Sequence, residues 1–160
     1  MKRENIGAFL MVLRKITLAV FLSSLMLAVI AIPAWSADKI HIVVKTVLAS
    51  QDEDYIDPSL SDLAKELKSL FRYSSYRLLG EKSTSLKQGE TGTMSLPGGR
   101  SLKITPLETR GDRVTLRLEI IKDGRQIFQT QARLLNRSSI TVGGPKYQGG
   151  YLLFNIFGSY

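Results

Sequence analysis

The stretch "RVTLRLEIIKDGRQIFQTQARLL", Arg113 to Leu135, decides the fold class, because apolar and polar residues alternate along it on both sides of an Asp-Gly pair. A period of two is typical of a β-strand with one buried face, and Asp-Gly is a turn signal. The stretch therefore predicts a β-hairpin whose inward residues are Val114, Leu116, Leu118 and Ile120, followed by Phe128, Thr130, Ala132 and Leu134.

The turn type of this hairpin depends on whether its loop has an even or an odd number of residues, because this number decides which residues share a face. A two-residue turn at Asp123-Gly124 would pair Leu118 with Gln129 and direct an arginine into the core. A three-residue loop, Lys122 to Gly124, pairs Leu118 with Phe128 and keeps the apolar residues on one face. We therefore expect the three-residue loop, with its glycine in the left-handed region as a G1 bulge.

The same parity directs three arginines outward and forms a candidate binding face. Arg113 is expected opposite Arg133, beside Arg117, with Lys103 joining from the preceding strand and Glu119 as the acid among them. Like charges across strands are mildly destabilising, and a bound anion or partner carboxylate would screen them. A solvated sheet face is the alternative interpretation.

The rest of the chain predicts one helix and further strands. Asp57 is placed as an N-cap with Pro58 in the first turn, and a helix is expected over 58–72. Its apolar stripe is Leu60, Leu63, Ala64, Leu67, Leu70 and Phe71. The other strands are expected over 39–48, 73–79, 91–96, 101–107, 139–142 and 151–157. This pattern indicates an α+β fold, with one amphipathic helix packed on a mostly antiparallel sheet of about seven to eight strands.

The N-terminal segment has the order of a secretory signal. Basic residues before position 16 are followed by an uncharged apolar run to Ile32, then Pro33, and small residues precede a cleavage point between Ser36 and Ala37. Residues 1–36 are therefore expected to be a signal peptide, and 37–160 a single α+β envelope domain. An uncleaved anchor, which would tether the domain to the inner membrane, is the alternative.

Composition excludes several classes of site. The chain has a formal net charge of +8, and residues 37–160 keep 18 basic and 13 acidic side chains, a net charge of +5. The chain has no cysteine, which excludes disulfides, thiol nucleophiles, zinc–thiolate sites and iron–sulfur clusters. No cofactor is expected, and no nucleic-acid partner is expected for an exported protein.

Two glycine pairs in "SSITVGGPKYQGGYLLF", Ser138 to Phe154, raise the question of a phosphate-binding loop. A phosphate loop opens a helix and places a lysine and a hydroxyl after its last glycine, whereas Gly150 precedes a strand former. The segment therefore predicts a hairpin or loop connection.

Other motifs favour structural roles. His41 is the sole histidine and lies on a predicted strand, and "RGD" at Arg110 to Asp112 lies where a turn is needed. A capped, solvated loop is favoured over a calcium loop for the acidic residues Asp52, Glu53, Asp54 and Asp57. No spacing brings together the carboxylates that a hydrolase would need, Glu81, Glu90, Glu108 and Glu119.

Two resemblances to known proteins bear on the fold and on the location of the chain. The segment 113–144, in which alternating strands lead to paired glycines, resembles the closing strands of the secretin core domain. That likeness implies β-strands that assemble into an outer-membrane ring. The whole chain, from "IHIVVKTVLAS" through "LFRYSSYRLL" and "LPGGRSLKI" to "VGGP", looks like a group of small exported bacterial proteins without an assigned activity.

We expect a non-enzymatic interaction domain, periplasmic or extracellular, that binds another envelope protein through a sheet edge or the basic face. Binding of an anionic lipid or polysaccharide by that face is the alternative. A carboxylate hydrolase is the third hypothesis.

Overall fold

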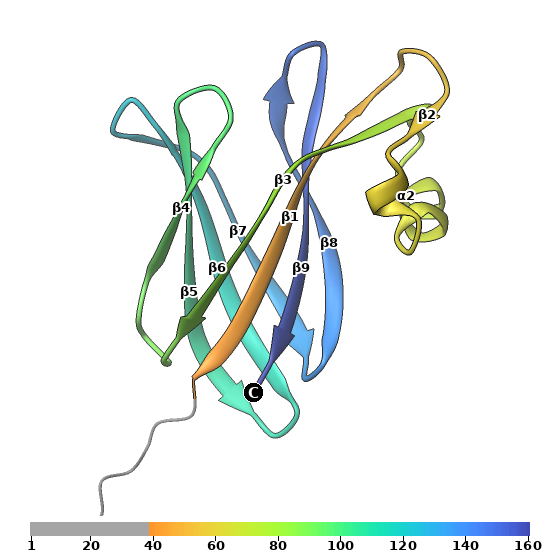
Figure 1. Ribbon diagram of the computed structural model, residues 1–160. Coiled ribbons are helices and arrows are strands. Elements are labelled where there is room, and N and C mark those ends of the chain that lie inside the picture. Colours follow the sequence, from red (N-terminus) through yellow and green to blue (C-terminus); the bar gives the residue numbers. More distant parts are fainter. Residues whose placement is uncertain (1–38) are drawn as a thin grey trace, which may run out of the picture. The chain divides into compact units, whose positions relative to one another are not determined.

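The computed structural model describes residues 39–160, and the nine strands of that part of the chain form two sheets (Figure 1). The order is β2-β3-β1-β9-β8 in the five-stranded sheet and β4-β5-β6-β7 in the four-stranded sheet. The strands are β1 (Ile40–Ser50), β2 (Tyr55–Ile56), β3 (Ser75–Leu86), β4 (Gly92–Leu96), β5 (Arg100–Arg110), β6 (Arg113–Lys122), β7 (Arg125–Leu135), β8 (Ser138–Tyr147) and β9 (Gly150–Ser159). The expected strand-rich, mostly antiparallel fold with one helix is confirmed, but the strands lie in two sheets rather than one.

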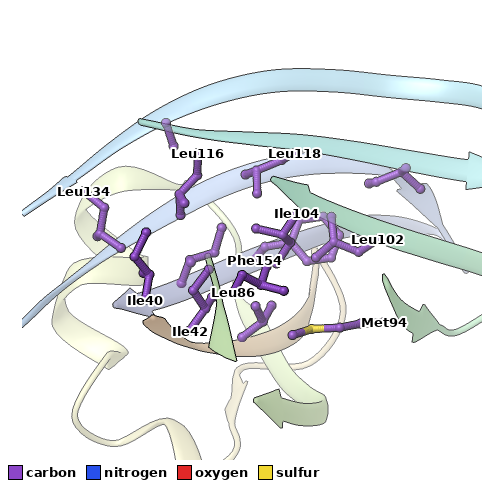
Figure 2. Packing of buried hydrophobic residues seen from close by; sticks show 14 of the residues in the cluster. Ile40, Ile42, Leu86, Met94, Leu102, Ile104, Leu116, Leu118, Leu134 and Phe154 are labelled. Carbon is purple, nitrogen blue, oxygen red and sulfur yellow. The ribbon is translucent and has the colours of Figure 1, made fainter. Parts of the chain in front are cut away.

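The main core lies between the two sheets, whose buried side chains point toward one another (Figure 2). The predicted inward residues of β6, from Val114 to Ile120, are at most 1% exposed. They pack with Ile42 of β1 and Phe154 of β9 from the opposite sheet. Burial of each such aliphatic side chain contributes about 1.5–3 kcal/mol to the free energy of folding.

The β6–β7 hairpin differs from the expected register. Asp123 and Gly124 both have positive φ, 49° and 73°, and form a two-residue turn rather than a three-residue loop. Leu118 pairs with Thr130, so the predicted pairing with Phe128 is wrong. An extra residue in β7, Ile127, is a bulge that shifts the parity and brings the apolar residues onto one face.

The connection from β7 to β8 takes the chain from one sheet to the other in two residues. The backbone N–H of Asn136 donates to the Asp112 carbonyl, and that of Arg137 donates to the Gly158 carbonyl. The Asn136 side chain also exchanges two hydrogen bonds with the backbone of Tyr160. These bonds fasten the two sheets to each other at this corner.

The expected helix over 58–72 is shorter and interrupted. A 3-10 turn, η2 (Pro58–Leu60), precedes the helix α2 (Ala64–Leu70). The predicted cap is confirmed, because Asp57 accepts hydrogen bonds from the Ser59 backbone N–H and hydroxyl. These bonds hold the pKa of Asp57 below its usual value.

The helix has a second hydrophobic cluster beneath it. Leu60 and Leu67 are buried with Val47, Tyr76 and Leu153, whereas Leu70 of the predicted stripe is 58% exposed. The Tyr76 hydroxyl donates to the carbonyls of Leu67 and Phe71 at the end of α2, at 3.1 and 2.7 Å. Burial raises the pKa of Tyr76.

Candidate functional site: a cationic concavity at the turn end

The glycine-rich segment is a β-hairpin, as predicted, formed by β8 and β9. Its turn residues Gln148 and Gly149 have positive φ, 43° and 78°. A Cβ on Gly144 would lie 2.5 Å from a ring carbon of Phe154, so a larger residue there would strike the core. Gly144 therefore permits close packing, Gly149 forms part of the turn, and Gly150 begins β9.

This hairpin lines a hollow at one end of the domain, which we call the turn-end concavity. Its volume is about 600 Å³. The lining comes from three turns that meet at one end of the two sheets: Gly98 and Arg100 from β4–β5, Lys122 from β6–β7, and residues 146–151 from β8–β9. The site is thus assembled from segments separated by more than 20 residues.

Aromatic rings and carbonyl groups hold two of its three cations in place. The Arg100 guanidinium lies 5.2 Å from the centre of the Tyr147 ring, and its Nη2 donates to the Lys146 carbonyl at 3.4 Å. Lys146 Nζ lies 5.8 Å from the centre of the Tyr151 ring. Such cation–π contacts place a positive charge without neutralising it. Lys122 is the register partner of Arg100 across β5 and β6.

The charge of the concavity is not balanced by acids. None of the nine described residues that line it is acidic. The four ion pairs found within residues 39–160 use other cations, namely Lys45, Lys68, Arg110 and Arg113. Asp123 follows Lys122 in the sequence but is exposed at the tip of its turn and is not among the lining residues. The concavity therefore presents three unpaired positive charges.

Arg100 is also short of hydrogen-bond acceptors. Its Nε is buried without a partner among the described residues, and Nη1 donates to the Pro97 carbonyl at 3.4 Å. Unsatisfied buried donors are costly, and a guanidinium bonds best to an anionic oxygen. Gly98 makes room for this arrangement, because a Cβ there would lie 2.5 Å from Arg100 Nη1.

The sequence-predicted basic face lies elsewhere, on the outer side of the β4-β5-β6-β7 sheet. The expected pairing of Arg113 with Arg133 is wrong, since Arg113 pairs with Leu135 and Arg133 with Thr115. Arg113 and Arg133 nevertheless line one hollow of about 300 Å³, together with Arg110 and Glu108.

Acids accompany this basic face more closely than expected. Asp112 lies 3.8 Å from Arg113, and Glu108 lies 2.7 Å from Arg110. Lys103 is directly across from Glu119 in the β5–β6 register. Arg117 does not line the hollow that contains Arg113 and Arg133. The structure thus places two of the four predicted residues in one hollow, and an acid lies beside Arg113 and opposite Lys103.

The other motifs have structural partners. His41 on β1 is exposed and bonded to Ser85, and the RGD tripeptide spans the turn between β5 and β6, as predicted. In the acidic loop, Asp52 accepts from the Ser50 hydroxyl, and Asp54 lies 3.9 Å from Lys68.

The four carboxylates considered for a hydrolase have separate neighbours. Glu81 lies 3.9 Å from Lys45, and Glu90 accepts a hydrogen bond from the Lys87 backbone N–H. Glu108 pairs with Arg110, as described above, and Glu119 is opposite Lys103. Within residues 39–160, no three His, Asp or Glu side chains are grouped as metal ligands would be.

Sequence reasoning missed Arg100, Lys122 and Lys146. They lie at strand ends beside three separate turns and carry no local motif. The glycine-rich segment is the only signal near one of them, Lys146. The predicted signal segment and its cleavage point lie outside the described residues. No helix within residues 39–160 is both long and apolar enough to cross a membrane.

Comparison with known proteins finds no matching family model, no similar curated protein and no similar solved structure.

Proposed function

We propose that residues 37–160 form a non-enzymatic, exported binding module that holds an anionic ligand in the turn-end concavity. The observation that carries this proposal is the unbalanced positive charge of Arg100, Lys122 and Lys146. These residues take part in none of the four ion pairs within residues 39–160. Two of them rest on tyrosine rings, which orient the cations and leave their charge available.

A comparison of two triple variants tests the location of the site. Replacing Arg100, Lys122 and Lys146 together by glutamine removes three charges from the concavity. Replacing Arg113, Arg117 and Arg133 by glutamine removes the same charge from the basic face, and so matches the change in net charge. Retention on immobilised dextran sulfate, with neutral dextran as the reference matrix, measures the loss in each variant.

We expect the concavity variant to lose retention and the basic-face variant to keep most of it. Retention of the parent falls as salt is raised, because exposed charges are screened over about 10 Å at 0.1 M ionic strength. Equal retention of the parent and the concavity variant at low salt would refute the proposed site. A loss confined to the basic-face variant would transfer the function to that face.

A second candidate function is the binding of another envelope protein along the edge strand β7. This strand pairs only with β6 in its sheet, and Ile127 and Leu135 on it are each 43% exposed. Free backbone groups at a sheet edge accept an extended segment of a partner, and such pairing depends little on salt.

Site-specific photo-crosslinking in intact cells tests this edge. A crosslinker at Ile127 is expected to capture one defined partner, whereas a crosslinker at Tyr55, which is 42% exposed on β2, is not. The same captured proteins at both positions would show that exposure alone governs the reaction and would exclude a specific edge.

Export is proposed together with this function. The exported protein is expected to begin at Ala37, and the intact mass of the purified mature protein measures this directly. A mass that retains residues 1–36 would instead indicate a domain tethered to the inner membrane.

A further inference from the structure

We infer that the ligand of the turn-end concavity is a stretch of a linear anionic polysaccharide rather than a lipid surface or a small free anion. The inference rests on the proposed function and names its ligand class. It is drawn from the size of the concavity, the nature of its walls and the composition of the turns around it.

The size of the concavity exceeds the needs of a single inorganic anion. Its volume of about 600 Å³ lies within the range of roughly 300–1,000 Å³ that is usual for sites of larger organic ligands. Its three cations carry one positive charge each, so a ligand that neutralises all of them must carry more than one negative charge. A chain with a charge on each repeat meets this requirement.

The walls suit sugar rings. Tyr147 and Tyr151 are half-buried, with an apolar ring body and a polar hydroxyl. A pyranose has an apolar C–H face that packs against such a ring, while its hydroxyls need hydrogen-bond partners. The exposed Gln148 amide lies beside the tyrosines and supplies such a partner.

The surrounding turns do not suit a lipid surface. Proteins that bind membrane interfaces insert apolar side chains below the headgroups. The turn tips here are Gly98-Gly99, Asp123-Gly124 and Gln148-Gly149, which offer no such side chain. The exposed carboxylate of Asp123 would also face the anionic headgroups. Arg100 and Lys122, which are only partly exposed, are reached more easily by a narrow polymer than by a flat bilayer.

A length series of oligogalacturonides tests this inference, because each of their sugar rings carries one carboxylate. Affinity is measured by calorimetry at low salt, for chains from the monosaccharide upward. We expect a total gain of at least about tenfold with length before the affinity levels off. Neutral dextran oligomers and phosphatidylglycerol vesicles are expected to bind more weakly than the long oligogalacturonide.

The variants connect this preference to the concavity. The triple change of Arg100, Lys122 and Lys146 to glutamine is expected to weaken binding of the long oligomer at least about tenfold, whereas the basic-face variant changes it less than about threefold. Lys146→Glu, at an exposed position that does not endanger folding, should weaken binding in the same direction if the triple variant is unstable.

Two results would overturn the inference while leaving the proposed function intact. Vesicle binding as tight as that of the long oligomer, and lost in the concavity variant, would identify a lipid surface as the ligand. Equal affinity for the monosaccharide and the long chain would identify a small-molecule site. The proposed function itself fails separately, if the concavity variant still binds dextran sulfate as the parent does.

Discussion

The close approach of Gly150 to the central strand β1 gives the sharpest prediction of stability. A Cβ at position 150 would lie against the carbonyl oxygen of Ala49, closer than any van der Waals contact allows. The neighbouring atoms belong to the backbone of β1, which is fixed by pairing with β3 on one side and β9 on the other. Neither side chain rotation nor a simple strand shift relieves the contact, so Gly150→Ala must strain the sheet.

The expected cost follows from this geometry. Adding one carbon to a fully packed site costs about 1–3 kcal/mol. The adjacent Gly149 provides the control, because it has a φ of 78° and open space around its Cβ position. Gly149→Asn places there a residue that tolerates left-handed backbone and should cost only a few tenths of a kcal/mol.

Urea denaturation of the two variants and the parent measures the difference. Gly150→Ala should lower the midpoint without changing the slope, which reports the surface exposed on unfolding. In a thermal scan the same loss corresponds to roughly 4 °C per kcal/mol for a domain of this size. If Gly150→Ala unfolds at the same urea concentration as Gly149→Asn, the tight packing of β9 against β1 is not real.

Substitutions at four further positions probe other parts of the domain. Leu118→Ala should cost about 2–5 kcal/mol by opening a cavity in the core, and an unchanged urea midpoint would contradict its burial. Gly124→Val should cost about 1 kcal/mol or more, because valine resists positive φ, while Gly124→Asn restores most of that loss in the same assay. Tyr76→Phe removes the hydroxyl that caps α2 and should cost about 0.5–1.5 kcal/mol. Since the pKa of Tyr76 is raised, the parent loses stability as pH rises through that pKa, and the urea midpoint of Tyr76→Phe should fall less in the same alkaline range. The pKa of Asp57 is lowered, so its stabilisation is present above the usual aspartate pKa and disappears as pH falls; the midpoints of Asp57→Ala and the parent should converge in acid.

The alternation of residues predicted the strands, because a half-buried sheet demands a period of two. It predicted which residues of β6 are buried, and it predicted the positive φ of Gly124. It did not predict the register, because either a longer turn or a bulge farther along the strand keeps the apolar residues of both strands on one face. The bulge at Ile127 does the latter, and nothing in the local sequence distinguishes the two.

Two larger features were also beyond local reasoning. Asn136 and Arg137 have the length of a hairpin turn, yet they join different sheets, since the bonds that decide this come from Asp112 and Gly158. The helical stripe was interrupted because Asp57 is bonded to β3 through the Tyr76 carbonyl, and Leu60 enters the core within the tight turn that follows.

The candidate site could not be predicted because it has no continuous sequence. Arg100, Lys122 and Lys146 are 22 and 24 residues apart along the chain. The β5–β6 register brings Arg100 opposite Lys122, and the packing of the two sheets adds Lys146 from β8. The basic face was predicted from the alternation of residues within the β6–β7 hairpin, which does not place the residues of β5 or of the β5–β6 turn. The ion pairs that Asp112 and Glu108 form with arginines were therefore found only in the structure.

The position of β1 determines when the domain can finish folding. This first strand lies between β3 and β9, and its contacts with β9 join residues 102 to 118 positions apart. Strands β4 to β7, in contrast, pair with their neighbours in sequence and close short loops. Long-range pairing forms slowly, because the entropy of loop closure is lost before the contacts form. We therefore expect a growing chain to complete the four-stranded sheet first and to leave β1 without its second partner until the ten residues of β9 have been made.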